Sequence, residues 1–453
     1  MAFRKDFLWG AGTSSYQIEG AAAQDGRGPS IWDAYCHAGG HIFKGHTGDV
    51  ACDHYHRYKE DVQLMRELGL RSYRFSISWT RILPDGIGEV NPAGIAFYNN
   101  LIDELLANDI TPCITLFHWD YPMALQDRGA WLNPESSDWF AYYAEVAAKA
   151  FGDRAKYFIT FNEPQCFIGM GYYDGVHAPG ERHDMPDMAL MLHNVCLAHG
   201  KAVQVIRAAV PDAKIGYAPT CGASMPLTES PEDIAAARKH YFSIEDNAWV
   251  WNVVLWSDPI ILGRYPEEEP FFREKIKPYL PKNYEEDLKT ICQPLDFYGQ
   301  NIYTCSLWTV GADGEPQWHD NPTGGPRTSN RWPVTPGALY WGPKFLYERY
   351  GLPIVITENG MSGHDWISLD GKVHDPYRID FTHRYLRALK RAADEGVDIL
   401  GYYHWSLMDN FEWCDGYNER FGLIYVDFET LERTKKDSFD WYRTVIESNG
   451  ESL

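Results

Sequence analysis

The sequence contains no apolar run of 18 residues, the minimum that a membrane-spanning helix needs. Its first residues, Met1 to Trp9, include no hydrophobic region of the kind found in a secretory signal peptide. Basic runs are also missing, and the formal net charge of −22 disfavours binding to nucleic acid or to an anionic membrane surface. We therefore expect a cytoplasmic protein whose partners include neither membranes nor nucleic acid.

Metal and nucleotide motifs are missing as well. The nine cysteines form no CxxC pair, their number is odd, and several stand in apolar runs, so we expect buried free thiols. No GxGxxG or GxxxxGK[ST] loop follows a predicted strand. His54 and His56 are two residues apart and cannot share a helix face, so solvated or capping histidines are expected. A metal-dependent hydrolase is therefore disfavoured, and we expect no metal and no cofactor.

Aromatic residues are abundant, with 17 Trp and 29 Tyr in 453 residues. Most of these rings must belong to a large core, for which a hydrophobic content of 45% is sufficient. Trp and Tyr beside polar groups also suit a pocket that stacks on sugar rings. No linker or internal repeat divides the chain, so a single domain over residues 1–453 is expected.

Strand-like and helix-like segments alternate along the whole chain, which is typical of an α/β fold with a parallel sheet. Eight such units favour a single (β/α)8 TIM barrel with elaborated loops at its C-terminal face over a doubly wound open sheet. The predicted strands are Phe7–Tyr16, Ser72–Trp79, Thr111–Trp119, Tyr157–Pro164, Lys214–Pro219, Asp296–Tyr303, Pro353–Glu358 and Ile399–Trp405.

Helices are predicted between and after these strands. The first has Asp53 as its expected N-cap and Gly69 as its stop signal. The segment Leu307–Pro336 has little periodicity and is expected to be a loop over the mouth of the barrel. The predicted helices cover Asp53–Leu68, Ala93–Ala107, Glu135–Phe151, Met188–Ala209, parts of Pro231–Leu255, Pro336–Tyr350, Asp375–Glu395 and Asp437–Ser448.

Polar and aromatic side chains stand at the ends of most predicted strands, where the active sites of barrels lie. Any one of them could be a loop residue without a function, but seven strand ends with such groups indicate a site. Two of these ends deliver a glutamate, Glu163 and Glu358. The others carry Gln17, Arg74, His118, Trp119, Asn162, Asn301, Tyr303 and Trp405.

A pair of carboxyl groups is what the hydrolysis of a glycosidic bond requires. In a retaining enzyme one carboxylate attacks the anomeric carbon, and the other protonates the leaving oxygen and later deprotonates water. An Arg and a Tyr near one carboxylate would keep it ionised as a nucleophile, whereas the acid needs a raised pKa. The separation between Glu163 and Glu358 along the chain shows that they come from different strands but gives no distance.

These motifs resemble glycoside hydrolase family 1, the β-glucosidase family, from about Phe7 to Phe428. Each motif is short, but their order over eight strands makes the resemblance specific. The segments that carry it are Gln17–Gly20, Arg74–Trp79, Asn162–Pro164, Thr357–Gly360 and Trp405–Trp413.

The resemblance implies that Glu358 is the nucleophile and Glu163 the acid/base, with Asn162 at the sugar 2-hydroxyl. Arg74 and Tyr303 would flank the nucleophile, with Asn301 in support, and no cofactor is implied. The implied substrate-binding residues are Gln17, His118, Trp119, Asn162, Tyr303, Trp332, Trp405, Glu412, Trp413 and Phe421.

Three positions separate members of the family. Glu412 suits a sugar with free 4- and 6-hydroxyls, whereas phospho-glycosidases carry Ser there with Lys nearby. Glu163 stands where thioglucosidases have Gln, so O-glycosides are expected. Gln165 replaces a usual Trp, a departure that puts the stacking preference for the leaving group in doubt.

The sequence therefore predicts a glycoside hydrolase, a retaining β-glucosidase whose substrates are β-glucosides and cello-oligosaccharides. The alternatives are a β-galactosidase or β-fucosidase, a 6-phospho-β-glucosidase, and a non-catalytic sugar-binding protein on the same scaffold. The sequence leaves homo-oligomerisation open.

Overall fold

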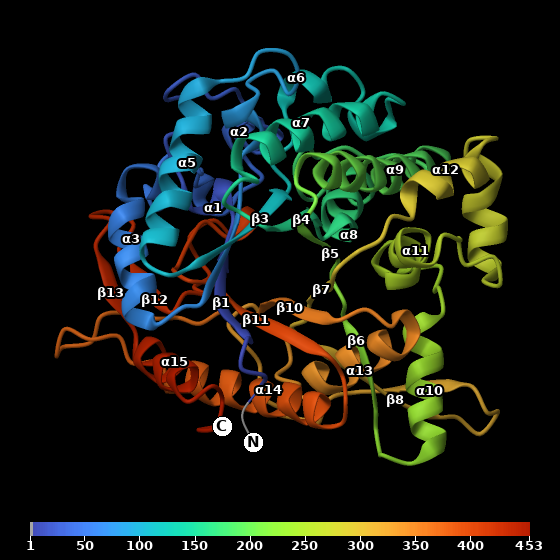
Figure 1. Cartoon of the computed structure of the whole chain (residues 1–453). Helices are drawn as coiled ribbons and strands as arrows, with labels where there is room; N and C mark the ends of the chain where they lie inside the picture. The colour runs from blue at the N-terminus through green and yellow to red at the C-terminus, as the bar shows by residue number, and fades with distance from the viewer. Residues whose placement is uncertain (1–2) are drawn as a thin grey trace.

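The computed structural model describes residues 3–453 and contains a sheet of eight parallel strands (Figure 1). Their order is β5-β4-β3-β2-β1-β11-β10-β7. Backbone hydrogen bonds from Asn301 N–H to Pro219 O (3.1 Å) and from Cys221 N–H to Asn301 O (2.9 Å) join the two end strands and nearly close the barrel. The strands are β1 (Leu8–Thr13), β2 (Ser72–Ser76), β3 (Thr111–Phe117), β4 (Tyr157–Asn162), β5 (Lys214–Ala218), β7 (Tyr298–Asn301), β10 (Ile354–Asn359) and β11 (Ile399–Trp405).

Helices surround this sheet, so each strand is covered on its outer face, and the expected (β/α)8 TIM barrel is confirmed (Figure 1). Several helices begin and end within three residues of the predicted bounds. The main outer helices are α3 (His54–Leu68), α5 (Pro92–Ala107), α7 (Ser136–Phe151), α9 (Met185–Ala209), α10 (Pro231–Phe242), α12 (Tyr284–Ile291), α13 (Ala338–Tyr350), α14 (Pro376–Asp394) and α15 (Asp437–Glu447).

The inside of the barrel is packed rather than hollow. Cys113, Ile159, Phe297, Val355 and Tyr403 form a buried cluster within it. The strands themselves approach so closely that some positions admit only glycine. A Cβ on Gly10 would come within 2.3 Å of the Tyr403 ring and 2.8 Å of the carbonyl oxygen of Ser72. This packing fixes the strand ends on which the polar side chains stand.

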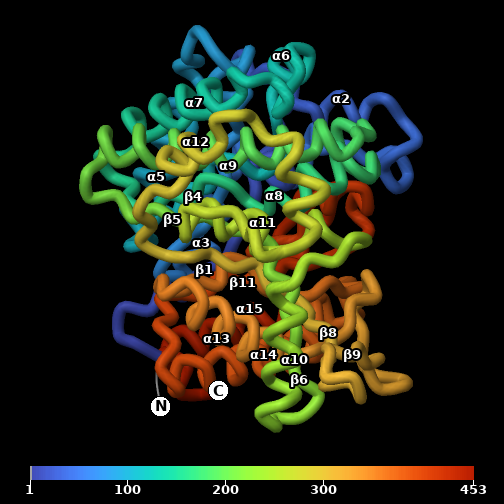
Figure 2. Tube along the Cα trace, turned by 90° about the vertical axis from the view of Figure 1, so that its right-hand side faces the viewer, coloured from blue at the N-terminus to red at the C-terminus, as the bar shows by residue number. Residues whose placement is uncertain are grey.

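The segment expected to be a loop, Leu307–Pro336, is in fact partly β structure. Strand β8 (Cys305–Val310) pairs with β9 (Pro316–His319) in an antiparallel hairpin. β8 also pairs in parallel with β6 (Ala223–Pro226), which lies some 80 positions earlier in the chain. This small sheet lies beside α10 (Figure 2), and the part of the segment that reaches the mouth of the barrel is the loop around Asn330 and Trp332.

The two predicted signals at the ends of α3 have different outcomes. Gly69 ends the helix in the left-handed conformation (φ 80°) and its N–H bonds the carbonyl of Arg66, as predicted. Asp53 precedes the helix, but it is itself left-handed (φ 54°), and its carboxylate bonds the His56 ring instead of a free backbone N–H. Asp53 is therefore not a side-chain cap.

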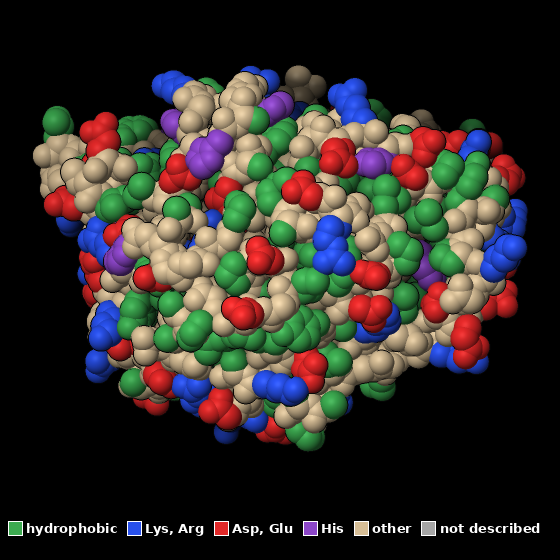
Figure 3. Space-filling view, turned by 90° about the horizontal axis from the view of Figure 1, so that it is seen from above, with side chains coloured by type: hydrophobic (Ala, Val, Ile, Leu, Met, Phe, Trp, Pro, Cys, Tyr) green, Lys and Arg blue, Asp and Glu red, His purple; other side chains and the backbone are tan. Residues whose placement is uncertain are grey.

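The surface is acidic overall, and on the face shown in Figure 3 acidic and basic side chains are interspersed. The two chain ends lie together, since Asn449 donates to the carbonyl of Phe3 at 2.7 Å and accepts from the Phe3 N–H through its own carbonyl at 3.1 Å. Among residues 3–453, no helix is both long enough and apolar enough to cross a membrane.

Candidate active site

A cavity of about 500 Å³ opens at the C-terminal ends of the barrel strands. Ten of its lining residues are among those predicted from the sequence: His118, Trp119, Glu163, Tyr303, Trp332, Glu358, Trp405, Glu412, Trp413 and Phe421. Four further predicted residues, Gln17, Arg74, Asn162 and Asn301, are fully buried and hydrogen-bond to lining residues or to one another. The structure thus brings the whole predicted set together.

Glu358 stands near the end of β10 with both carboxylate oxygens engaged. Arg74 Nη1 lies 2.6 Å from Oε1, and the Tyr303 hydroxyl donates to Oε2 at 2.7 Å. Arg74 is itself fixed, because its Nη1 also donates to the Thr357 carbonyl at 3.1 Å. A buried guanidinium and a phenol donor favour the anionic form of a carboxylate and set its orientation.

Glu163 directly follows β4 and precedes α8 (Pro164–Ile168). Its backbone is left-handed (φ 47°), which ends the strand abruptly and turns the chain into the helix. The Cys166 thiol donates to Glu163 Oε2 at 3.3 Å. Burial, and then the negative charge of Glu358, raise the pKa of Glu163 to about 8. Glu163 therefore holds its proton at neutral pH, in contrast to an exposed glutamate.

Asn162 connects several of the predicted residues. Its Oδ1 accepts from Arg74 Nη2 (2.6 Å) and from Asn301 Nδ2 (2.9 Å), and its Nδ2 donates to His118 Nε2 (3.1 Å). Burial, and then the charge of Arg74, lower the pKa of His118 well below its usual value. His118 is therefore neutral, with its proton on Nδ1, a buried atom that has no partner among residues 3–453 and is free to donate.

Glu412 lies on the loop after β11, next to Gln17 of α1 (Ser15–Ile18). Gln17 Nε2 donates to Glu412 Oε2 (3.3 Å), and Gln17 Oε1 accepts from the hydroxyl of Ser14 (2.6 Å). Burial, and then the charges of Asp415 and Glu358, raise the pKa of Glu412 well above its ordinary value. Glu412 therefore ionises less readily than an exposed glutamate.

Aromatic rings form two walls of the cavity. On one wall the His118 ring stacks on Trp405, with centroids 5.6 Å apart, and Trp119 lies 4.4 Å from Trp413. On the other, Trp332 contacts Tyr303 at 5.1 Å and Phe421 at 6.2 Å. Flat apolar walls of this kind, with hydrogen-bonding groups between them, suit a sugar ring, whose C–H faces are apolar and whose edge is polar.

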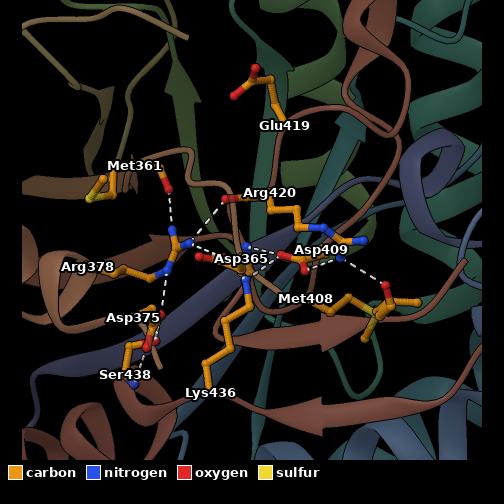
Figure 4. Close-up of polar contacts among 12 residues, drawn as sticks. Met361, Asp365, Asp375, Arg378, Met408, Asp409, Glu419, Arg420, Lys436 and Ser438 are labelled. Atoms are coloured by element: carbon orange, nitrogen blue, oxygen red, sulfur yellow. Dashed lines mark hydrogen bonds and ion pairs between the residues drawn. The ribbon is translucent and has the colours of Figure 1, made fainter. Parts of the chain in front are cut away.

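Behind the loop that carries Glu412 lies a buried ion network (Figure 4). Lys436 lies between Asp365 and Asp409, and Arg378 bonds Asp365, Asp375 (2.8 Å) and the Met361 carbonyl. Arg420 completes the network with an ion pair to Asp409 at 2.6 Å. Although burial acts to raise it, the charges of Arg378 and Lys436 lower the pKa of Asp365 to about 2. Three carboxylates thus balance three cations.

We expect Lys436→Met to destabilise the protein by about 3–5 kcal/mol, because it leaves Asp365 and Asp409 buried without the ammonium that they share. The measurement is the free energy of urea unfolding, with kcat/KM as a second readout because Asp409 precedes Glu412 on the same loop. Lys289→Met is the matched control, since Lys289 and its partner Glu286 are both 72% exposed and the loss should be below about 1 kcal/mol. Equal losses in the two variants would contradict this account of the network.

Gln165, which stands where the family usually has Trp, does not line the cavity. Its side chain is fully buried behind the lining residues Cys166 and Thr220. Its Nε2 donates to the Thr220 carbonyl (3.0 Å), and its Oε1 accepts from the Thr220 N–H (3.3 Å). The amide therefore fastens the loop after β4 to the loop after β5.

Sequence reasoning missed a second group of lining residues. Thr304, Asn330, Cys414 and Asp415 stand within two positions of predicted residues and could have been found by that proximity. The others carry no motif and reach the cavity from loops and short helical turns. They are Cys166, Met170, His177, Thr220, Gly222 and Trp251.

Comparison with known proteins decides which family this site belongs to. The model of glycosyl hydrolase family 1 matches residues 1–451. The chain belongs to this family. It is 45% identical to the β-glucosidase A of Thermotoga maritima, over 99% of this chain and 98% of the other. It is 44% identical to a 1,4-β-D-glucan glucohydrolase of Thermotoga neapolitana, over 99% of both chains.

The solved structures of family 1 agree with this assignment. A β-glucosidase from Thermotoga maritima in complex with glucoimidazole superposes on this chain with a TM-score of 0.90, at 44% identity and with 99% of both chains covered. As a family 1 member the protein is a glycoside hydrolase, and the family resemblance seen in the sequence is confirmed. The catalytic pair predicted from the sequence thus lies in a cavity of this family's fold.

Several histidines outside the cavity have structural partners. His54, expected to be solvated or capping, is in fact buried, with Nδ1 2.7 Å from Asp61. His37 lies 3.0 Å from Asp49, and His46 accepts from the Tyr417 N–H at 3.1 Å. Within the part of the chain that the structure describes, no group of three or more His, Cys, Asp or Glu side chains is arranged to hold a metal ion.

Proposed function

We propose that the protein is a retaining β-glucosidase in which Glu358 is the nucleophile and Glu163 the acid/base. The observation that carries this proposal is the difference between the two carboxyl groups at one cavity. Glu358 is held by Arg74 and Tyr303, which favour its anion, while burial and the charge of Glu358 keep Glu163 protonated. One group is thus prepared to attack and the other to donate a proton.

In the first step an oxygen of Glu358 attacks the anomeric carbon, and the bond from that carbon to the glycosidic oxygen breaks. The glycosidic oxygen takes the proton of Glu163 and leaves as the alcohol, and the sugar stays esterified to Glu358. Asn162, fixed by Arg74 and Asn301, is the residue that we expect to bond the sugar 2-hydroxyl through its amide. Such a bond gains strength as charge develops in the transition state.

In the second step the roles of the acid/base reverse. The esterified Glu358 carries no charge, so the electrostatic effect that raised the pKa of Glu163 disappears and that pKa falls. Glu163 is now an anion that takes a proton from water, and the resulting hydroxide displaces Glu358 from the anomeric carbon. Two inversions at this carbon return the β-configuration.

Glucose is the sugar that these residues support best. His118 and Glu412, the latter bonded by Gln17 from behind, offer a donor and a carboxyl group to the hydroxyls of an unmodified hexose, and the rings of Trp405 and Trp413 line the same cavity. Relatives named β-glucosidase and 1,4-β-D-glucan glucohydrolase support β-glucosides and β-1,4-linked cello-oligosaccharides as substrates. A galactoside or fucoside differs at few of these hydroxyls and is the second candidate.

A 6-phosphate does not suit the cavity. No Lys or Arg side chain appears in the lining formed by the described residues, whereas the Glu358 carboxylate does. A phosphate dianion at the 6-position would therefore enter the cavity without a counter-charge.

The test is a substrate panel of p-nitrophenyl β-glucoside, β-galactoside, β-fucoside and 6-phospho-β-glucoside. We expect the glucoside to be cleaved, and its 6-phosphate to have kcat/KM lower by at least about 100-fold, because like-charge contact costs several kcal/mol. Faster cleavage of the 6-phosphate would overturn the glucosidase assignment. The ratio of glucoside to galactoside and fucoside rates decides between the two candidate sugars.

We also propose that the protein works as a single catalytic domain in the cytoplasm. The support for the compartment is its nine free cysteines, seven of which are buried, since such thiols are typical of proteins in a reducing environment. The support for one domain is a single large core cluster, whose residues come from the whole described chain, from Phe3 to Ile446.

A further inference from the structure

The loops around the barrel divide the cavity into two sides of different chemistry. Loops after β1, β3 and β11 bring Gln17, His118 and Glu412, the groups suited to sugar hydroxyls. In the order around the barrel, β5 stands between β4, which carries Glu163, and β7. Under the proposed function Glu163 protonates the leaving oxygen, so the loops after β4, β5 and β7 border the leaving group. The residues that these loops add to the lining are Cys166, Met170, His177, Thr220, Gly222, Trp251, Thr304, Asn330 and Trp332.

Trp251 is held at this side by a rigid short segment. It ends η4 (Trp249–Trp251), in which Trp249 and Val250 are 1% and 2% exposed while Trp251 is 40% exposed. Trp256 Nε1 donates to the Val250 carbonyl at 3.0 Å. Asn252 bonds the Val254 N–H (2.9 Å) and the Ser243 carbonyl (2.7 Å) through its side chain. The buried neighbours and these bonds fix a large, exposed indole at the mouth of the cavity.

Close packing of two loops brings Met170 to the same side. A Cβ on Gly169 would lie 3.0 Å from Val250, so the start of η3 (Gly169–Tyr173) and η4 lie in direct contact. Met170 and Trp251, the residues that follow Gly169 and Val250, both line the cavity. A thioether beside an indole forms an apolar, adaptable surface for a flat group.

Hydrogen-bonding groups are few on this side. The amide of Gln165 is occupied by Thr220, so it is not available to a ligand. Asn330 offers an amide, but its Oδ1 already accepts from the Thr328 hydroxyl. The other polar groups are the hydroxyls of Thr220 and Thr304 and the ring of His177, which is neutral because burial lowers its pKa to about 4. Apart from Glu163, no Asp, Glu, Lys or Arg side chain from the loops after β4, β5 and β7 appears in the lining formed by the described residues. A second sugar would therefore find little to bond its hydroxyls, whereas an aromatic ring needs only the flat apolar surfaces.

We propose that Trp251, together with Met170, forms a leaving-group subsite that selects β-glucosides of flat aromatic alcohols over those of a second sugar. Trp332, which is 39% exposed and belongs to the loop after β7, is the other indole of this subsite. Trp251 acts in recognition alone and takes no part in the chemistry at the anomeric carbon. The inference rests on the proposed function, because that function determines which side of the cavity receives the leaving group.

The test compares Trp251→Ala with the unchanged protein on three substrates. These are 4-methylumbelliferyl β-glucoside, cellobiose, and trifluoroethyl β-glucoside, which has a good leaving group without a ring. Loss of an aromatic stacking partner should lower kcat/KM for the methylumbelliferyl substrate roughly 3- to 10-fold, mainly through KM. The kcat/KM for the trifluoroethyl substrate should change by less than about 2-fold, and that for cellobiose should fall less than that for the aromatic substrate. The Trp251→Phe variant, which keeps an aromatic ring, should retain most of the kcat/KM that Trp251→Ala loses.

Trp366→Ala is the matched control, because Trp366 is 68% exposed and does not line the cavity. Equal losses on all three substrates would show a structural role for Trp251, and a cellobiose loss as large as the aromatic loss would show a sugar subsite. Either result, or no change at all, overturns the inference while the proposed function stands. Failure of the unchanged protein to cleave any of the three glucosides would instead contradict the proposed function.

Discussion

Glu358→Ala should lose activity on every β-glucoside by a factor on the order of 10⁴ or more, because no other group can form the covalent intermediate. Arg74 and Tyr303 would then face an empty space without the carboxylate that they orient. The loss should be the same for good and poor leaving groups, since the missing bond is to the sugar and not to the aglycone. The measurement is kcat/KM for p-nitrophenyl β-glucoside and for cellobiose.

Folding of the Glu358→Ala variant must be checked, because the removed charge is buried beside Arg74. Glu358→Gln keeps the shape of the side chain and should be almost as inactive, with near-normal binding of a glucose-like inhibitor. A variant that binds such an inhibitor and still turns over substrate within 100-fold of the unchanged protein is incompatible with Glu358 as the nucleophile.

Glu163→Ala should show a loss that depends on the leaving group. Removal of a general acid costs about 10²- to 10⁴-fold for a poor leaving group such as the second glucose of cellobiose. An activated aryl glucoside leaves without protonation, so its first step should be nearly unaffected and the glycosyl-enzyme should accumulate. Azide or formate can then attack in place of activated water and restore turnover. The measurement is the rate on dinitrophenyl β-glucoside with and without added azide.

The pH profile provides a separate check on Glu163. Because the pKa of Glu163 is raised to about 8, its acid form prevails below that pH and activity should fall as the pH rises through about 8. The apparent value belongs to the coupled pair of Glu163 and Glu358. In Glu163→Ala this alkaline limb should disappear. If it persisted unchanged in that variant, some other group would have to be the acid.

Much of the fold could be predicted because its signals are local. Apolar strand-like runs that end at polar residues marked all eight strands, and Ile399–Trp405 coincides with β11. Errors arose where a short helix follows a strand at once. The predicted strand Phe7–Tyr16 included the start of α1, and Ser72–Trp79 included the first residue of the helix that follows β2. Short apolar segments of either kind look alike in sequence.

The β8–β9 hairpin was not predicted, although its pairing is local and the turn dipeptide Asp313-Gly314 stands between the two strands. β9 is exposed or half-buried throughout, so it lacks the alternation of a strand with one buried face. Only the pairing of β8 with β6 is distant, and nothing within Leu307–Pro336 indicates that partner. The position of this segment over the mouth was predicted from its lack of periodicity, whereas the binding role of Trp332 came only from the family resemblance.

The two sides of the cavity differ in how far sequence reasoning reached. Glu163 and Glu358 could be predicted because each follows a buried strand, and the strand ends of a barrel share one face. Met170 and Trp251 could not, since their position depends on contact between Gly169 and Val250 of two irregular segments. The burial of Gln165 could not be predicted for a related reason, because its bonds to Thr220 cross from one loop to the other.

The measurement that tests the central claim most directly is mass spectrometry after incubation with dinitrophenyl 2-deoxy-2-fluoro-β-glucoside. Fluorine removes the hydroxyl near Asn162 and slows the second step more than the first, because the activated leaving group still departs. We predict one added fluoroglucosyl group per chain, carried by the peptide that contains Glu358. A label on a different carboxylate, or none while dinitrophenyl β-glucoside is still cleaved, would contradict the assignment of Glu358 as the nucleophile of a retaining enzyme.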